Sequence, residues 1–206
     1  MDDVTAFVLA GGRSTRMGWD KALLSFGKQT LLERALHTAA AVAGKVMIVG
    51  PRARYAGYGE VIEDIFPDCG PLGGIHAALS ATQTDLNLIL SVDTPLLTSD
   101  FLAWLVMEAR GSNELSVVPE ALGGPQPLCA VYRRGLRVAA EHALKDKDYK
   151  IGHLFPRTPT RYVSEAKIRS AGFSPMIFRN ANTSTEYEEL VRSEAHAGSG
   201  KRNCGE

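Results

Sequence analysis

The residue types best suited to chemistry are gathered near the start of the chain, in the stretch Leu9-Ala10-Gly11-Gly12-Arg13-Ser14-Thr15-Arg16-Met17-Gly18-Trp19-Asp20-Lys21. An apolar run leads directly into two glycines, which let successive backbone N–H groups turn toward an anion. Two arginines and a lysine add positive charge, and arginine can bind a phosphate through two donors at once. The stretch therefore predicts a phosphate-binding loop; the alternative is an ordinary strand-to-helix turn with solvated arginines.

Two well-known glycine motifs do not describe this loop. A Walker A motif requires a lysine directly after its second glycine, whereas Gly18 is followed by Trp19. The dinucleotide-binding pattern G-x-G-x-x-G is absent from the stretch as well. A phosphate loop of another type is therefore the interpretation.

Two acidic side chains follow segments that predict strands. Asp93 comes directly after the apolar run Leu86–Val92, where a carboxylate could hold Mg²⁺ together with phosphate oxygens. Asp before Thr-Pro is also good turn chemistry, so a turn cap is the alternative. Asp64 follows the brief strand Val61–Ile62 and could equally be a solvated loop acid.

Lys21 is the cation expected to act in catalysis, because a flexible ammonium can follow an oxygen as its charge grows. The alternative for Lys21 is an exposed lysine at the start of a helix. A second glycine cluster, Gly70–Gly74, precedes an apolar helix predicted over Ile75–Ala81. Its N–H groups could bind an anion, or the cluster could be a plain helix start.

Strand and helix patterns alternate through the first half of the chain, which implies parallel βαβ units with helices on both faces of a sheet. Ligands of such folds bind beyond the carboxyl ends of the strands. Four polar or glycine positions fall at these ends: Gly11, Gly50, Asp64 and Asp93. The predicted strands are Val4–Leu9, Lys45–Val49, Val61–Ile62, Leu86–Val92, Leu115–Val118 and Leu128–Tyr132, with further candidates at Thr160–Val163 and Met176–Phe178.

The first helix is predicted to begin at Thr30, because Thr30 and Glu33 have the spacing of a capping box. Thr183 and Glu186 repeat that spacing before a final helix. The remaining helices are predicted after a cap on Ser99 or Asp100, over Arg134–Lys147 and over Ser184–Val191, whereas Arg52–Gly59 should be irregular. The result is one three-layer α/β/α domain with a mostly parallel sheet over residues 1–193, followed by a tail, 194–206, expected to be disordered.

Composition narrows the classes of protein further. The chain has 206 residues, of which 45% are apolar and 22% charged, with a formal net charge of +0. This balance argues against a general nucleic-acid binder. No signal peptide and no apolar run of bilayer length is found, so we expect a cytoplasmic protein with no membrane partner. Cys69, Cys129 and Cys204 form no C-x-x-C pair, so neither a zinc site nor a disulfide framework is predicted.

The first loop resembles the signature L-A-G-G-x-S-x-R-M-G-x-x-K of the nucleotidyltransferase superfamily. Within it, the chain is most similar to the molybdenum cofactor guanylyltransferases, which attach GMP to molybdopterin. The resemblance extends from Val4 to Leu190. It includes four further segments: V-I-x-D at Asp64, G-P-L-x-G at Gly70, the apolar-x-x-D-[MT]-P pattern at Asp93, and N-x-N-T at Asn180.

This resemblance implies a Rossmann-like nucleotidyltransferase domain and assigns roles to particular residues. It implies catalytic roles for Lys21, Arg16 and Asp93. It implies nucleotide contacts at Leu9, Ala10, Gly11, Gly12, Arg13, Lys21, Gly50, Asp64 and Asp93. It implies Mg²⁺ on Asp93 and Asn182, and an acceptor site at Gln126, Pro127, Asn180 and Asn182. For Asn182 a helix cap is the alternative, and for Gln126 and Pro127 a prolyl turn.

The implied reaction transfers GMP from GTP to the terminal phosphate of molybdopterin and releases pyrophosphate. Molybdoenzymes or their chaperones are the implied protein partners. The family often has Asn near the base where this chain has Gly50, so base choice stays open between GTP and another nucleotide such as CTP. A sugar phosphate or an alcohol phosphate could replace molybdopterin as the acceptor. A non-catalytic protein that binds the cofactor and hands it on is a competing function of a different class.

Overall fold

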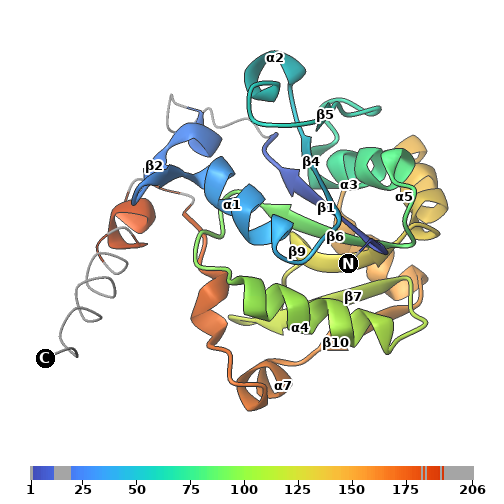
Figure 1. Cartoon of the computed structure of the whole chain (residues 1–206). Coiled ribbons are helices and arrows are strands. Elements are labelled where there is room, and N and C mark those ends of the chain that lie inside the picture. Colours follow the sequence, from blue (N-terminus) through green and yellow to red (C-terminus); the bar gives the residue numbers. More distant parts are fainter. Residues whose placement is uncertain (1, 12–19, 182, 184, 191, 193–206) are drawn as a thin grey trace, which may run out of the picture.

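The computed structural model describes residues 2–11, 20–181, 183, 185–190 and 192 (Figure 1). In this part of the chain one large sheet has the strand order β10-β7-β9-β6-β1-β4-β5, and β8 pairs with β7 outside that path. Its strands are β1 (Val4–Leu9), β4 (Lys45–Val49), β5 (Val61–Ile62), β6 (Leu86–Ser91), β7 (Ser116–Ala121), β8 (Gly124–Pro125), β9 (Cys129–Arg133) and β10 (Thr160–Val163). A separate hairpin joins β2 (Ser25–Phe26) and β3 (Gln29–Thr30).

Helices connect these strands and cover the sheet (Figure 1). The α-helices are α1 (Leu31–Ala40), α2 (Arg52–Tyr55), α3 (Gly70–Ala81), α4 (Ser99–Arg110), α5 (Leu136–Lys145), α6 (Ile151–Leu154) and α7 (Glu165–Ser170). The described residues also form three short 3-10 helices, which are η1 (Lys21–Leu23), η2 (Phe155–Arg157) and η3 (Pro175–Phe178). Residues 185–190 are also helical. Of the helices described, none is long and apolar enough to cross a membrane.

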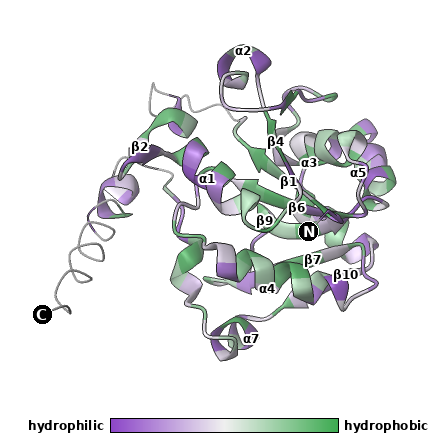
Figure 2. Cartoon of the chain, viewed as in Figure 1, coloured by the Kyte–Doolittle hydropathy of each residue, from purple (hydrophilic) through white to green (hydrophobic). Residues whose placement is uncertain are grey.

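Two hydrophobic cores lie on opposite faces of the sheet, which gives the fold three layers. Side chains alternate along a strand, so Val4, Ala6 and Val8 of β1 pack into the core that includes α1 and α4. Phe7 and Leu9 point the other way, into the core that includes α3 and α5. Figure 2 shows the hydrophobic residues concentrated in the central strands. The predicted three-layer α/β/α fold is confirmed.

The central strands end at the same edge of the sheet. β1 runs parallel to both β4 and β6, and Leu9 is in register with Val49 on one side and Ser91 on the other. β5 continues the parallel pairing beyond β4, whereas β9 is antiparallel to β6 and β7. The sheet is therefore mostly parallel, as predicted, and its carboxyl edge is where the predicted site residues should meet.

Several predicted boundaries differ from the structure. α3 begins at Gly70 rather than Ile75, because the glycines form the first turns of the helix. Thr98, rather than Ser99 or Asp100, caps α4 by accepting a hydrogen bond from the Phe101 amide. Arg52–Tyr55 forms the short helix α2, and the candidate strand Met176–Phe178 belongs to η3. β7 continues to Ala121, beyond the predicted end at Val118, and α5 is shorter at both ends than the predicted helix Arg134–Lys147.

Both predicted capping boxes are confirmed in their hydrogen bonds. The Thr30 hydroxyl accepts from the Glu33 amide, and the Glu33 carboxylate accepts from the Thr30 amide. Thr183 and Glu186 make the same reciprocal pair. The expected tail, 194–206, lies outside the described residues, so the division into a domain and a tail stays a prediction.

Candidate functional site

A cavity opens at the carboxyl edge of the parallel strands. It has a volume of about 450 Å³, within the range of small-molecule sites. Its lining comes from the ends of β1, β4 and β6, from the segment after β5, from the start of α3 and from the residue before β9: Leu9, Gly11, Val49, Asp64, Asp68, Gly70, Pro71, Gly74, Ser91 and Leu128. Three predicted nucleotide contacts, at Leu9, Gly11 and Asp64, therefore share one cavity.

Lys21 and Asp93 face each other near this edge of the sheet. The ammonium of Lys21 lies 3.5 Å from a carboxylate oxygen of Asp93, and the two side chains are 14% and 21% exposed. Asp93 lies two residues after Ser91, and Ser91 lines the cavity. Two of the three residues with an expected catalytic role, Lys21 and Asp93, are thus in contact and partly shielded from water, and the third, Arg16, lies outside the described residues.

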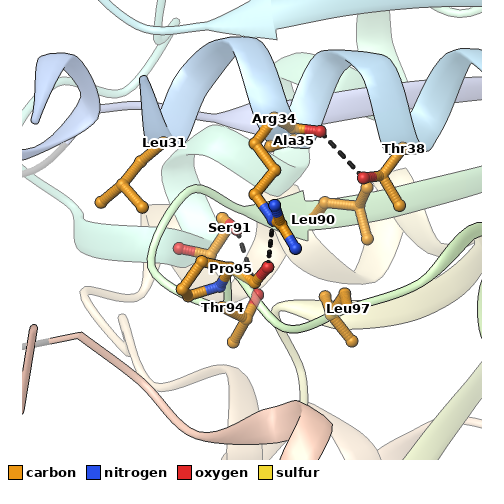
Figure 3. Close-up of a pocket in the computed structure, with 9 residues that line it drawn as sticks. All are labelled: Leu31, Arg34, Ala35, Thr38, Leu90, Ser91, Thr94, Pro95 and Leu97. Atoms are coloured by element: carbon orange, nitrogen blue, oxygen red, sulfur yellow. Dashed lines mark hydrogen bonds between the residues drawn. The ribbon is translucent and has the colours of Figure 1, made fainter. Parts of the chain in front are cut away.

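The loop that carries Asp93 is fixed on both sides. Arg34 reaches from α1 and its guanidinium donates to the carbonyl oxygen of Pro95 (Figure 3). The Thr94 hydroxyl donates to the carbonyl oxygen of Ser91, which closes a tight turn around Asp93. The backbone amide of Ala181 donates to the carbonyl oxygen of Asp93 across 2.9 Å. The position of Asp93 therefore depends on α1 and on the segment after η3.

The glycines at the start of α3 allow this helix to approach the strands. A Cβ on Gly73 would lie 2.8 Å from the carbonyl oxygen of Phe66, a distance that real Cβ atoms do not show. A Cβ on Gly74 would lie 3.4 Å from the side chains of Leu9 and Val49. Gly70 has a φ of +64°. Gly70, Pro71 and Gly74 bring the start of α3 to the wall of the cavity, and the start of a helix favours an anion.

Two predicted nucleotide contacts lie deeper at the same edge. Ala10 is buried, and its amide and that of Gly11 both donate to the carbonyl oxygen of Val49. Gly50 lies against Gly11, since a Cβ on Gly11 would be 3.7 Å from the Gly50 Cα. The predicted loop thus starts from a backbone that β4 holds in place.

The described acceptor residues lie in two separate segments, one before β9 and one after η3. The Gln126 side-chain amide donates to the carbonyl oxygens of Ala121 and Gly124, and the carbonyl oxygen of Pro127 accepts from the buried Tyr132 hydroxyl. These contacts shape the segment before β9, and only its neighbour Leu128 lines the cavity. Asn180 is exposed and adjoins Ala181, which bonds to Asp93.

Four predicted site residues lie outside the described part of the chain: Gly12, Arg13, Arg16 and Asn182. Their roles stay predictions. Within the described residues, no three His, Cys, Asp or Glu side chains are clustered as a metal site. Asp93 offers one carboxylate, the donor that Mg²⁺ prefers, and magnesium in such sites commonly takes its other ligands from phosphates and water. The donor chemistry therefore fits a metal bound jointly with a nucleotide.

Sequence reasoning missed several residues at this edge. Asp68 and Ser91 line the cavity together with Asp64, and desolvation raises the pKa of Asp64 above its ordinary value. The nearness of Asp68 to the Gly70 cluster was the available signal. Tyr55, whose hydroxyl lies 3.0 Å from the carbonyl oxygen of Ala10 at the end of β1, gave no signal because it lies in a segment without any apolar periodicity.

A mostly parallel α/β sheet with a cavity at its carboxyl edge defines a class of proteins that bind nucleotides and related ligands there. Comparisons with known proteins place the chain in such a class as well. Residues 6–158 match the family model described as the MobA-like NTP transferase domain. The chain belongs to this family of nucleotidyltransferases.

Two relatives are similar over nearly their full lengths. A probable molybdenum cofactor guanylyltransferase of Pelotomaculum thermopropionicum is 32% identical over 189 residues, covering 90% of this chain and 91% of the relative. A molybdenum cofactor guanylyltransferase of Desulfosudis oleivorans is 32% identical over 204 residues, covering 98% and 99%.

Solved structures show the same fold. Molybdopterin-guanine dinucleotide biosynthesis protein A of Archaeoglobus fulgidus superimposes with a TM-score of 0.82 at 23% identity, covering 93% of this chain and 99% of that one. A Mycobacterium tuberculosis protein solved in complex with manganese superimposes with a TM-score of 0.66 at 16% identity, covering 93% and 98%.

Proposed function

We propose that this protein transfers GMP from GTP to the terminal phosphate of molybdopterin and releases pyrophosphate. The observation that carries the proposal is the contact of Lys21 with Asp93 beside a cavity formed by the strand ends. The names of the two relatives at 32% identity support the choice of GTP and molybdopterin as substrates.

The reaction needs no nucleophile from the protein. A phosphate monoester with a second pKa of about 6 is mostly dianionic at neutral pH, so molybdopterin supplies its own nucleophile. One of its oxygens forms a bond to the α-phosphorus of GTP while the bond from that phosphorus to the β-phosphate oxygen breaks. The protein's contribution is to align the two substrates and to offset their negative charge.

Each predicted residue has a part in this alignment. Gly11 and the start of α3, at Gly70 and Gly74, line the cavity and would contact the nucleotide. Gly12, Arg13 and Arg16 are proposed to hold the triphosphate. Lys21 would stabilise the charge that develops on the phosphate oxygens during transfer. Asn180, Asn182, Gln126 and Pro127 are proposed to border the acceptor.

A divalent cation belongs to the proposal as well, held by Asp93 and by Asn182. When bound, Mg²⁺ would offset the negative charge of the phosphates. The Mycobacterium tuberculosis protein of the same fold, which was solved in complex with manganese, supports a divalent metal here. The Ala181 amide fixes the backbone of Asp93, which carries the carboxylate proposed to hold the metal.

Pyrophosphate release tests the proposal directly. The purified protein is incubated with Mg²⁺, molybdopterin and GTP, and in parallel with CTP, UTP or ATP. We expect pyrophosphate with GTP only when molybdopterin is present. Preference for CTP would change the base assigned, and release with another phosphate acceptor would change the acceptor. Tight binding of GTP and molybdopterin without any pyrophosphate would instead support a non-catalytic carrier.

A further inference from the structure

Tyr55 is buried beneath the predicted nucleotide site, yet it belongs to a short helix on the outer edge of the sheet. Its side chain is 1% exposed. Its hydroxyl lies 3.0 Å from the carbonyl oxygen of Ala10 and 2.9 Å from the nearer carboxylate oxygen of Asp20. A phenol has one proton to donate, so these two acceptors share it. Tyr55 therefore joins the end of β1 to the residue that precedes Lys21.

Asp20 connects Tyr55 to the helix that begins with Lys21. Its carboxylate accepts a hydrogen bond from the Ala22 amide at 3.2 Å and so caps η1, the short helix that begins with Lys21. Arg54, next to Tyr55, lies 3.5 Å from the same carboxylate. The ammonium of Lys21 in turn lies 3.5 Å from Asp93. An unbroken series of contacts thus connects Tyr55 to the pair assigned to catalysis.

Gly50 makes room for the tyrosine ring. A Cβ on Gly50 would lie 3.0 Å from a ring carbon of Tyr55 and 3.2 Å from the Gly11 nitrogen. No larger residue fits at position 50 unless the ring moves. Gly50 and Tyr55 therefore form a matched pair, in which the ring occupies the space that a side chain at position 50 would fill.

We propose that Tyr55 is a positioning residue, whose hydroxyl holds Asp20 against the end of β1 and thereby sets the ammonium of Lys21 opposite Asp93. This inference rests on the proposed function for its catalytic consequence, but the placement of Lys21 can be tested without activity. Burial, and then the neighbouring Asp20 carboxylate, raise the pKa of Tyr55 above its ordinary value. The hydroxyl therefore stays a donor throughout the neutral pH range.

The test compares Tyr55→Phe with the wild type and with a matched control, Tyr58→Phe. Phenylalanine keeps the ring beneath Gly50 and removes only the hydroxyl. Tyr58 lies three residues further on and is 38% exposed, so its replacement removes a hydroxyl at the surface. Asp20→Ala is a second variant, which removes the other partner of the same contact.

The first readout is the rate at which a small amine-acylating reagent labels Lys21, followed by mass spectrometry. Freeing the ammonium from Asp93 should raise this rate about threefold to fivefold in Tyr55→Phe and Asp20→Ala, the scale of a partly exposed ion pair. The double variant should show no further increase, because both changes break one connection. Labelling of the exposed Lys150 should not change. Unchanged labelling of Lys21 in Tyr55→Phe would overturn the proposal.

The second readout is the split between kcat and KM for GTP in the pyrophosphate assay. Loss of a charge-assisted hydrogen bond should lower kcat about tenfold in Tyr55→Phe with little change in KM, and leave Tyr58→Phe near the wild type. A lower melting temperature with unchanged kcat would show a purely structural role. If the wild type releases no pyrophosphate, the proposed function fails, and the labelling rate still decides whether Tyr55 positions Lys21.

Discussion

The backbone amide of Ala181 donates a hydrogen bond to the carbonyl oxygen of Asp93, with 2.9 Å between nitrogen and oxygen. This contact joins the segment after η3 to the loop after β6, although the two are far apart in sequence. It accounts for the presence of Asn180 beside a strand end that sequence reasoning linked to metal binding. The loop after β6 is therefore set by tertiary contacts as well as by its own turn.

Arg34 is the second tertiary contact of this loop, and its removal should cost stability. Arg34→Met deletes the hydrogen bond to the Pro95 carbonyl oxygen. It also removes the contact of the guanidinium with the Phe26 ring, whose centre lies 5.0 Å away. Hydrogen bonds from charged groups contribute about 1.5–3 kcal/mol, so the free energy of unfolding should fall by about that amount. Urea unfolding measures the change. Arg169→Met, which breaks an exposed ion pair with Glu165, is the control and should change stability by less than about 1 kcal/mol. Equal effects of the two variants would contradict this account.

Gly73 should tolerate no side chain, because α3 packs directly on the backbone of Phe66. Gly73→Ala places a Cβ 2.8 Å from the Phe66 carbonyl oxygen, so the helix or the loop must shift. Overpacking of this kind costs about 1–3 kcal/mol. Gly152→Ala in α6 is the matched control, since a Cβ there would meet nothing within 4 Å and should be neutral or stabilising. Thermal unfolding compares the two, and a Gly73→Ala protein as stable as Gly152→Ala would refute the packing argument.

His76 should make the fold sensitive to mild acid. It is 2% exposed in α3, and neither ring nitrogen has a hydrogen-bond partner among the described residues. Burial lowers its pKa below the ordinary value of 6.5, and nearby Glu141, Arg137 and Lys145 add smaller effects of both signs. At pH values just below 6.5, His76 of the unfolded chain binds a proton, whereas the buried His76 of the folded protein does not. The free energy of unfolding should therefore decrease as the pH falls below 6.5.

Replacing His76 removes this proton-binding difference. In urea unfolding at about pH 7.5 and about pH 5.5, His76→Leu should lose less stability between the two pH values than the wild type does. His37→Gln, on the exposed side of α1, should keep the pH dependence of the wild type. If His76→Leu retained that dependence too, His76 would not be its source.

Periodicity and capping chemistry predicted most of the fold. Runs such as Val4–Leu9 are buried on both faces, so their apolar character is continuous and easily recognised. Thr30 and Glu33 satisfy each other locally, which is why the start of α1 could be predicted from sequence. The start of α3 could not, because glycine disfavours helices and is retained at Gly73 for contact with Phe66.

The site was predictable where residues follow strands and unpredictable where distant segments meet. Leu9, Gly11 and Asp64 share a cavity because parallel strands end together, a rule that applies without coordinates. The role of Tyr55 depends on the ring passing beneath Gly50 to reach Ala10 and Asp20, a contact that no local pattern encodes.

The central claim is that the Lys21–Asp93 pair acts in nucleotidyl transfer, and the rate of pyrophosphate release from GTP and molybdopterin by Lys21→Met and Asp93→Asn tests it most directly. Lys45→Met is the control for loss of a lysine charge. It breaks an ion pair with Glu60 in which each side chain is 54% exposed. We predict that both site variants fold as the wild type does and lose at least about 100-fold in kcat, while the control stays near the wild type. Turnover within about threefold of the wild type in either folded site variant would contradict the claim.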